Sequence, residues 1–328
     1  MEILPIFQNF LHKIHIGRKR FAGMVMIMNA VQLVSRDIEK AIRVQTKVID
    51  YMTDFFVKRG FKWLLPVMLS SITDPLWPDP AASKMRAPEI EAYGTKLKLM
   101  HSMILHKQFA IAMGLEKIFV LSPNIRLEER DRDDGRHAYE FTQLDFEIAY
   151  ASMEDVMGLI EELMVGLLKE ARKWEELEER GLPRIKAPFK RFTMSEIMEE
   201  FGDDEEASKA MDEPFWITDI SREFYDREDP ERPGHFRNYD LILPEGYGEV
   251  SSGGEREWQY EVIVKKLKES KLSLEAFKPY LEVAKAGKLK PSAGAGIGVE
   301  RVVRYLVGAR HIAEVQPFPR VPGIPAVI

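Results

Sequence analysis

The sequence predicts an α+β fold, and three patterns in its 328 residues indicate that class. Residues 124–147 contain two alternating segments joined by a charged loop, which is the pattern of an antiparallel hairpin. Apolar residues recur at spacings of three and four in 35–60 and again in 152–168, which predicts amphipathic helices. Polar loops, not helices, join the further strands expected at 215–220, 236–243 and 247–252.

The elements before the hairpin are bounded by stop and turn signals. The helix over 35–60 has cations in its last turn and Gly60 just beyond them, which is a helix stop signal. A strand closed by a proline is expected at 61–66, a second strand at 93–100 and a helix at 102–114. Four prolines exclude regular structure from 70–90, and a surface loop of that length is often a lid.

The hairpin would place charged side chains on one face of a sheet. In its second strand Leu144 and Phe146 alternate with Asp145 and Glu147, so apolar and acidic side chains point to opposite faces. An ordinary half-solvated hairpin would alternate in the same way, because antiparallel sheets commonly face water on one side. The shared polar face is therefore either solvated or a ligand site, and it is expected to carry Arg126, Glu128, Phe141, Asp145 and Glu147.

Beyond the hairpin the chain alternates charged and glycine-rich segments. Residues 169–213 are charge-rich and are expected to form a peripheral insertion, in which Thr193 and Glu196 predict a capping box. Two consecutive glycines at 253–254 permit close backbone approach before a helix over 256–268.

A glycine-rich strand that runs into a helix lies near the C-terminus, over 292–307. Its glycine spacing and its position do not fit a dinucleotide-binding βαβ unit. Glycines in a strand, with Arg301 at the helix start, suit a nucleotide lying across a sheet; close packing of the helix on the sheet is the other interpretation. Lys107 also has two interpretations. It lies on an apolar helix face, so its amine either extends to solvent or meets an anionic ligand.

Composition limits the class of protein. Lys and Arg number 47 against 53 Asp and Glu, so a net charge of −6 does not predict a nucleic-acid coat protein, although a local basic groove remains compatible with it. The absence of cysteine excludes disulfides, thiolate zinc sites and cysteine nucleophiles. No apolar run is long enough for a membrane span, and a cytoplasmic protein is the natural expectation.

One domain is expected from residue 29 to 328. Residues 1–28 form a tail that is disordered or precedes the natural start, for which Met28 is the candidate.

Three ordered motifs resemble the signature motifs of class II aminoacyl-tRNA synthetases: 61–66, then 125–128 with 136–137 and 140–141, then 296–301. The aspartyl and asparaginyl subgroup is most similar, on the pattern Arg-His-x-x-Glu-Phe-Thr-x-Leu-Asp-x-Glu and on the segment 248–256. The resemblance covers about 30–328. It implies an antiparallel β-sheet flanked by α-helices and a homodimer formed through the first motif.

The resemblance also implies how ATP is held. Arg126 would bind the α-phosphate together with the attacking carboxylate, and Phe141 and Arg301 would sandwich the adenine. Glu128 would accept from the adenine amino group, and Gly298 would lie near the ribose. Arg126 and Arg301 would thus be the catalytic residues, because they stabilise charge on the phosphorus oxygens.

The remaining implied roles concern the phosphates, the metal and the amino acid. Arg136 and His137 would contact the outer phosphates, and Asp240 and Glu249 would bind Mg²⁺ that bridges them. The expected aspartate-binding residues are Lys107, Asp145, Ser252 and Arg256. Of these, Asp145 would take the ammonium group, and the other three would surround the carboxylates.

Two features depart from the tRNA ligases of this subgroup. At most about 28 residues precede the domain, which begins with the helix leading into the first motif, so no anticodon-binding domain is expected and tRNA is an unlikely partner. Ile104 replaces the first glutamine of the aspartyl-type Gln-Leu-Tyr-Lys-Gln motif, while Lys107 is retained. The segment 317–323 is asparaginyl-like. In this combination the chain resembles archaeal asparagine synthetases that are related to asparaginyl-tRNA synthetase.

That resemblance implies an ATP-dependent ligase with L-aspartate and ammonia as substrates. Aspartate and ATP would form an aspartyl-adenylate, which ammonia attacks to give asparagine, AMP and pyrophosphate. Asp74 and His101 are the candidates for deprotonating ammonium. The alternatives are a ligase that charges a tRNA without reading its anticodon, and a non-catalytic paralogue that binds an amino acid or adenylate.

Overall fold

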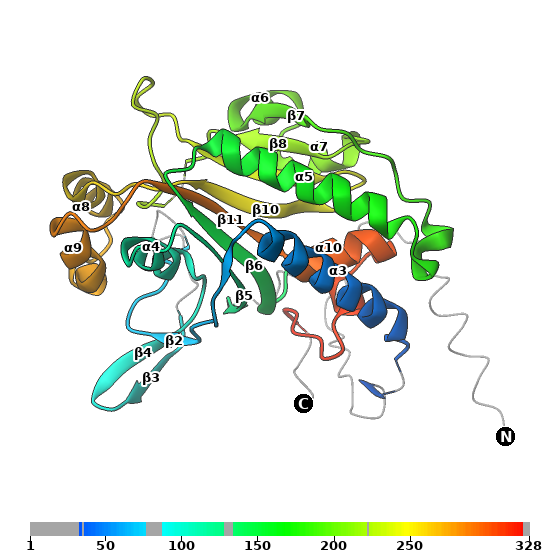
Figure 1. The fold of residues 1–328 in the computed structure, drawn as a ribbon, viewed down its shortest axis with the longest axis horizontal. Coiled ribbons are helices and arrows are strands. Elements are labelled where there is room, and N and C mark those ends of the chain that lie inside the picture. Colours follow the sequence, from blue (N-terminus) through cyan, green and yellow to red (C-terminus); the bar gives the residue numbers. More distant parts are fainter. Residues whose placement is uncertain (1–32, 35, 77–86, 128–133, 222, 324–328) are drawn as a thin grey trace.

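The structure is a computed structural model that describes residues 33–34, 36–76, 87–127, 134–221 and 223–323. The expected tail 1–28 and the middle of the proline-rich loop lie outside these described residues. A mixed sheet of eight strands forms the centre of the molecule, in the order β1-β5-β6-β11-β10-β9-β8-β7 (Figure 1). The pairs at its two ends, β1 with β5 and β7 with β8, are parallel, and the others are antiparallel. This architecture confirms the predicted α+β class.

The strands of this sheet are β1 (Lys62–Trp63), β5 (Lys117–Ile125), β6 (Glu140–Ala149), β7 (Lys190–Thr193), β8 (Phe215–Thr218), β9 (Asn238–Leu243), β10 (Gly248–Glu255) and β11 (Ser292–Gly298). A second, three-stranded sheet has the order β2-β4-β3 and consists of β2 (Leu69–Ser70), β3 (Glu89–Ala92) and β4 (Thr95–Leu99). The hairpin of β3 and β4 projects from the lower left of Figure 1. The expectation that 70–90 has no regular structure is wrong at its end, because residues 89–90 pair with β4. The strand predicted at 61–66 is thus reduced to two residues, because β1 is an edge strand with a single neighbour.

The α-helices of the described part are α3 (Glu39–Lys58), α4 (Ile104–Ala112), α5 (Met153–Ala171), α6 (Met194–Glu200), α7 (Asp204–Ala210), α8 (Tyr260–Glu269), α9 (Lys278–Lys285) and α10 (Val299–Val307). Their ends follow the signals in the sequence. Ser152 and Thr193 form capping boxes at the starts of α5 and α6, and Gly60 follows α3 with a φ of +81°.

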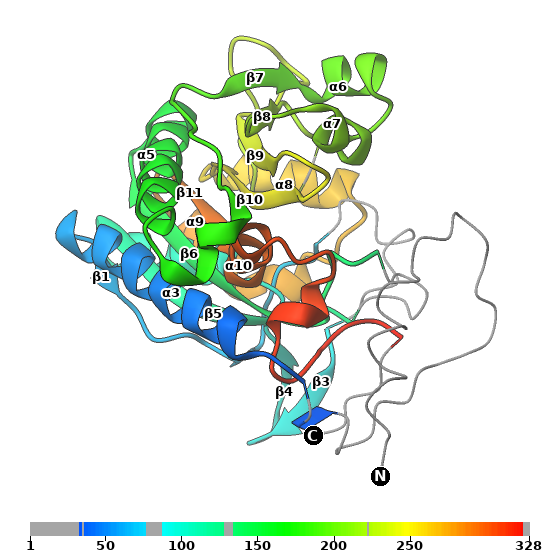
Figure 2. The same cartoon turned by 90° about the vertical axis from the view of Figure 1, so that its right-hand side faces the viewer.

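Helices α3, α5 and α10 cover one face of the large sheet (Figures 1 and 2). Their apolar faces form the main core with alternate residues of the strands, such as Phe56 of α3 against Phe146 of β6. Leu144 and Phe146 are fully buried in this core, as the alternation of the hairpin predicts. Residues 141, 143 and 145 of β6 therefore point to the opposite face, where the cavity described below lies.

Residues 169–213, expected as a peripheral insertion, are integrated with the sheet. They lie at its far edge, where β7 is the terminal strand and α6 and α7 pack beside it. Two of their side chains, Met194 and Asp204, also reach the cavity wall.

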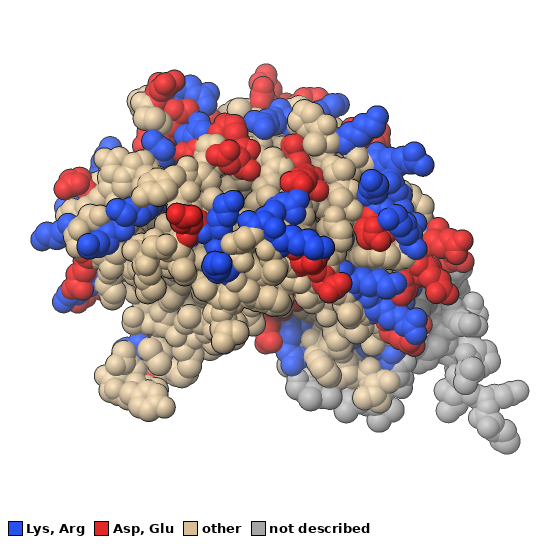
Figure 3. All heavy atoms as spheres, in the orientation of Figure 1, with Lys and Arg blue, Asp and Glu red and all other residues tan. Residues whose placement is uncertain are grey.

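The surface of the face seen in Figure 1 mixes acidic and basic side chains, with no area of one sign dominating it (Figure 3). None of the helices in the described ranges combines the length and the apolar character that a membrane crossing needs.

Candidate active site

A cavity of about 610 Å³ lies on the face of the sheet opposite α3 and α5. Residues of strands β6, β9, β10 and β11 line its floor, α4 and the first turn of α10 contribute to its walls, and the loop that precedes β9 lines its inner end. Every predicted site residue that the structure describes lines this cavity: Lys107, Arg126, Arg136, His137, Phe141, Asp145, Asp240, Glu249, Ser252, Arg256, Gly298 and Arg301. Glu128 lies outside the described residues, so its predicted role remains a prediction.

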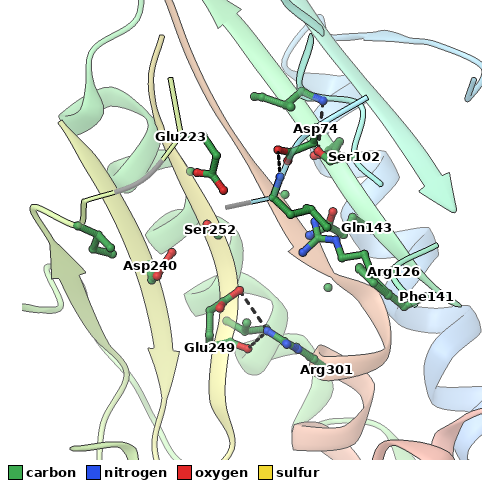
Figure 4. Close-up of a pocket in the computed structure, with 18 of the residues that line it drawn as sticks. Asp74, Ser102, Arg126, Phe141, Gln143, Glu223, Asp240, Glu249, Ser252 and Arg301 are labelled. Atoms are coloured by element: carbon green, nitrogen blue, oxygen red, sulfur yellow. Dashed lines mark hydrogen bonds and ion pairs between the residues drawn. The ribbon is translucent and has the colours of Figure 1, made fainter. Parts of the chain in front are cut away.

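One end of the cavity, where the sequence predicts the nucleotide and which is here called the nucleotide end, is formed by Arg126, Phe141 and Arg301. Arg126 and Phe141 lie side by side, and the guanidinium carbon of Arg126 is 5.2 Å from the centre of the Phe141 ring (Figure 4). Arg126 Nε donates to the carbonyl of His101 over 3.2 Å, which fixes the direction of its side chain. Arg301 donates through Nη1 to the Glu249 carbonyl at 2.8 Å and to Glu249 Oε1 at 3.1 Å. A planar ligand can thus meet flat groups from different elements.

Arg136 and His137 mark the outer end of the cavity. Arg136 Nη1 lies 3.7 Å from Asp204 Oδ2, and a Cβ at Gly248 would lie only 2.5 Å from the same nitrogen, so only glycine leaves room for Arg136 there. His137 Nδ1 is 2.5 Å from Asp134 Oδ2. Burial opposes ionisation of Asp134, but His137 and two backbone N–H groups outweigh it and lower the pKa of that carboxyl. This end therefore offers the guanidinium of Arg136 and the ring of His137 to anionic ligand atoms.

Lys107 is the buried cation of the inner end. Its side chain is almost fully enclosed, and Nζ donates to Asp145 Oδ1 at 3.0 Å and to the carbonyl of Phe146 at 3.2 Å. Glu147 Oε2 lies a further 3.6 Å from Nζ. The snorkelling interpretation of Lys107 is thus wrong: the amine is directed into the sheet, where carboxylates hold it.

Arg256 is the second buried cation of this end. Its Nε donates to Glu147 Oε1 at 3.0 Å, its Nη1 lies 3.4 Å from Asp226 Oδ1, and its Nη2 donates to the carbonyl of Gly294 at 2.9 Å. Burial alone would lower the pKa of Arg256, but Glu147 and Asp226 outweigh it and raise that pKa. The side chains of Lys107 and Arg256 therefore both face the inner cavity, each held in place by carboxylates of the protein.

Several residues at the inner end were not predicted. Asp226 accepts from Asn238 Nδ2 at 2.9 Å, and Tyr225 donates to Asp74 Oδ1 at 3.0 Å. Both Tyr225 and Asp226 line the cavity from the loop between β8 and β9. No periodic pattern marks that loop in the sequence, so only the fold brings it to the site.

Asp74 and His101, the two predicted candidates for a base, take different positions. Asp74 lines the cavity, whereas His101 does not and is almost fully buried behind it. His101 Nδ1 lies 3.0 Å from the Asp74 carbonyl, which can only accept, so Nδ1 carries the proton. Burial lowers the pKa of His101, and its ring is therefore neutral near pH 7.

A hydrogen-bonded chain orients Gln143, another unpredicted side chain of the cavity. Ser122 donates to Asn124 Oδ1 at 3.1 Å, and Asn124 Nδ2 donates to Gln143 Oε1 at 2.5 Å. Because its carbonyl oxygen is engaged, the amide nitrogen of Gln143 is directed toward Gly296 on the cavity floor. The Gln143 amide is thus a fixed neutral donor on the cavity floor, close to Arg126 (Figure 4).

Asp240 of β9 and Glu249 of β10 are the predicted metal ligands, and they lie on neighbouring strands at the cavity edge (Figure 4). Among the described residues no group of three or more acidic, histidine or cysteine side chains could enclose a metal. Two carboxylates suit Mg²⁺, which is commonly held by one or two carboxylates, water and substrate phosphates. The pair thus fits a metal shared with a nucleotide, and does not fit a closed structural metal site.

An antiparallel sheet that brings a strand-end arginine, a facing aromatic ring and an arginine at a helix start into one cavity is the catalytic architecture of class II tRNA synthetases. The chain belongs to this family, since the family model for tRNA synthetases class II (D, K and N) matches residues 24–322.

Sequence relatives place the chain near the asparaginyl branch. It is 32% identical over 315 residues to the asparagine–tRNA ligase of Pyrococcus abyssi, which covers 88% of this chain and 70% of the relative. It is 27% identical over 313 residues to the asparagine–tRNA ligase of Thermoplasma acidophilum, with 87% and 70% covered. The aspartate–tRNA(Asp/Asn) ligase of Methanopyrus kandleri is 36% identical over 246 residues, which covers 68% of this chain and 55% of that protein.

Solved structures agree with this placement. The asparaginyl-tRNA synthetase from Pyrococcus horikoshii complexed with asparaginyl-adenylate superposes with a TM-score of 0.78 at 26% identity, covering 88% of this chain and 70% of that one. The aspartyl tRNA synthetase from Entamoeba histolytica has a TM-score of 0.71 at 23% identity, with 97% and 67% covered, and it supports the fold alone.

Proposed function

We propose that the protein is an asparagine synthetase that activates L-aspartate with ATP and transfers the aspartyl group to ammonia. The observation that carries this proposal is the pair of buried cations, Lys107 and Arg256, at the inner end of the cavity. Aspartate has two carboxylates to place, whereas asparagine has one and a neutral amide. Both side chains already have carboxylate partners in the protein, and a substrate carboxylate can add a charge-assisted hydrogen bond that is stronger than the bond a neutral amide can form.

In the first step a β-carboxylate oxygen of aspartate attacks the α-phosphorus of ATP, and the bond to the departing pyrophosphate breaks. Arg126 neutralises the α-phosphate and the incoming carboxylate, and Arg301 stacks on the base opposite Phe141. Asp240 and Glu249 would hold Mg²⁺, which would neutralise charge on the phosphates when bound. Arg136, His137, Glu128 and Gly298 complete the ATP site in this proposal.

In the second step ammonia attacks the acyl carbon of the aspartyl-adenylate, and the bond to the AMP oxygen breaks. Asparagine and AMP leave, and the proton lost by ammonium passes to a base. Asp74 is our candidate for that base, because it lines the cavity and its carboxylate is oriented by Tyr225. His101 donates from Nδ1 to the Asp74 backbone carbonyl and acts as a residue that positions Asp74.

Orientation of the substrate separates this reaction from tRNA charging. Asparagine formation requires the β-carboxylate near Arg126, while tRNA charging requires the α-carboxylate there. Ile104 lines the cavity as an apolar group where the aspartyl-type motif has glutamine. Isoleucine cannot make the polar contact that glutamine would make with the substrate, and this difference supports a rotated aspartate. In that orientation Asp145 takes the ammonium group and Ser252 lies beside the carboxylates.

A tRNA ligase is the second candidate function, because the relatives reported above are named as asparagine– and aspartate–tRNA ligases. In that reading the 3′-hydroxyl of a tRNA replaces ammonia as the nucleophile, and the adenylation half of the site is unchanged. A non-catalytic paralogue is the third reading, and the retention of Arg126, Glu249 and Arg301 in one cavity argues against it.

One incubation separates the three functions. Protein, radiolabelled aspartate, ATP, Mg²⁺ and ammonium chloride are combined with and without total tRNA, and asparagine, AMP and acid-precipitable label are measured. We expect asparagine and AMP in equal amounts without tRNA. Label on tRNA with no free asparagine would establish the ligase instead, and nucleotide binding without AMP release would establish the silent paralogue.

A further inference from the structure

The first residues of strand β6 extend beyond its neighbour β11, so the backbone N–H of Thr142 has no partner on that strand. Pairing between β6 and β11 ends at Gln143 of β6 and Gly298 of β11, because β11 ends there and α10 begins at the next residue. Backbone groups of successive strand residues point to alternate sides. Arg126 N donates to the Tyr139 carbonyl on the β5 side, so the N–H of Thr142 points to the side where β11 has ended. A buried N–H without an acceptor there would be costly.

Glu300 is the acceptor for this N–H. It lies in the first turn of α10, and each of its carboxylate oxygens is 3.0 Å from Thr142 N. A charged acceptor makes this contact stronger than a bond between neutral groups. The Glu300 carboxylate therefore takes the place of a strand carbonyl and connects the beginning of β6 to the beginning of α10.

The two residues joined in this way are next to the two flat groups of the nucleotide end. Thr142 follows Phe141, and Glu300 precedes Arg301; Phe141, Glu300 and Arg301 all line the cavity. We propose that Glu300 is a positioning residue that sets the separation of Phe141 and Arg301, and with it the affinity for the adenine of ATP. This inference rests on the proposed ATP site and assigns Glu300 no contact with the reacting atoms.

The surroundings of Glu300 make the contact sensitive to pH. Burial raises the pKa of Glu300 to about 7, although the Thr142 N–H and Arg301 act in the opposite direction; Glu140 on β6 raises it further. Protonation below pH 7 removes the charge and weakens the bond to Thr142. The affinity for ATP should therefore decline as the pH falls through 7.

The test compares Glu300→Ala and Glu300→Gln with the matched control Glu261→Gln. Glu261 also lies in the first turn of a helix, α8, but it is exposed and does not line the cavity. Aspartate-dependent ATP–pyrophosphate exchange gives KM for ATP, KM for aspartate and kcat, and titration calorimetry with a non-hydrolysable ATP analogue gives binding without chemistry. Neither readout depends on whether ammonia or tRNA is the acceptor.

We expect Glu300→Ala to raise KM for ATP about tenfold with little change in kcat or in KM for aspartate, and Glu300→Gln to raise it about threefold because one acceptor oxygen remains. The increase of KM for ATP below pH 7 should disappear in Glu300→Gln. Unchanged KM for ATP in both variants, or equal losses for ATP and aspartate, would overturn the inference. Absence of exchange in the unaltered protein, with analogue binding still weakened by Glu300→Ala, would reject the proposed activity and leave this inference standing.

Discussion

At the scale of single residues, the inner cavity depends on balanced buried charge. Lys107 is enclosed with Asp145 and Glu147, and Arg256 shares Glu147 with it. Such a group is costly to assemble and more costly to break, because a partner left behind is a buried charge without compensation. Binding of the substrate and stability of the fold are therefore linked at these positions.

Lys107→Met keeps the volume of the side chain and removes its charge. We expect KM for aspartate in pyrophosphate exchange to rise at least tenfold, and the free energy of unfolding to fall by about 3 kcal/mol because the facing carboxylates lose their cation. The control Lys265→Met removes an exposed lysine, 71% accessible, and should change neither. An unaltered KM for aspartate in Lys107→Met would exclude Lys107 from substrate binding.

Glu300 should also affect stability in a pH-dependent way. Its pKa is raised to about 7 by burial, so the ionised form costs the folded state stability, and this cost develops as pH rises from about 4.5 to 7. Glu300→Gln lacks that cost. Its stability relative to the unaltered protein should therefore improve by about 3 kcal/mol between pH 5 and 8, as measured by urea midpoints. Parallel pH curves for the two proteins would contradict the assignment.

At the scale of elements, strand β11 has almost no space for side chains at its glycine positions 294 and 296. A Cβ on Gly296 would lie 2.8 Å from Asp145 Oδ1 and 3.0 Å from Gln143 Nε2. A Cβ on Gly294 would lie 2.1 Å from the Phe146 carbonyl, which is backbone of the neighbouring strand. The glycines thus serve two purposes, space for ligand-binding side chains at Gly296 and close strand pairing at Gly294.

This difference predicts two kinds of defect. Gly296→Ala should displace the ends of the Asp145 and Gln143 side chains, raise KM for aspartate at least tenfold and lower the free energy of unfolding less than Gly294→Ala does, because side-chain atoms can shift where backbone atoms cannot. Gly294→Ala should separate β6 from β11 and lower the free energy of unfolding by about 3 kcal/mol. Gly158→Ala, on the exposed side of α5 with open space around it, is the control and should stabilise slightly. Equal stability losses in both β11 variants would show that the distinction is wrong.

At the scale of the whole molecule, apolar side chains remain exposed around the edge strand β1. Val57, Trp63, Leu65 and Met68 are between 38% and 86% accessible, and they surround the motif that we expect to form the homodimer. A short edge strand with apolar neighbours is a surface that a second copy of the chain can cover. We therefore expect a dimer with two-fold symmetry.

The double substitution Trp63→Glu with Leu65→Glu places charges in that surface. It should convert the dimer to a monomer, seen as a halved mass in light scattering, because like charges would meet across a two-fold axis. Met198→Glu, at a residue of α6 that is 54% accessible, is the control and should leave the mass unchanged. A monomeric unaltered protein would refute the expected dimer directly.

The sequence alone determined most of the longer helices and strands, because these depend on residues that are near neighbours in the chain. The alternation at 141–147 predicted which side chains of β6 enter the core, and capping residues at 152 and 193 predicted helix starts. The motif resemblance pointed to twelve residues that the structure brings to one cavity. Helix α9 carried too few distinctive signals to be predicted.

Tertiary structure alone decided how these residues meet. The pairing of Gly296 with Asp145 and of Ser252 with Asp240 sets the depth of the cavity, and it joins strands far apart in sequence. Tyr225 and Asp226 became site residues only because their loop folds against the inner end. Sequence periodicity reports which face of an element is buried, but long-range register decides which faces oppose each other, so contacts such as Glu300 with Thr142 follow only from the assembled sheet.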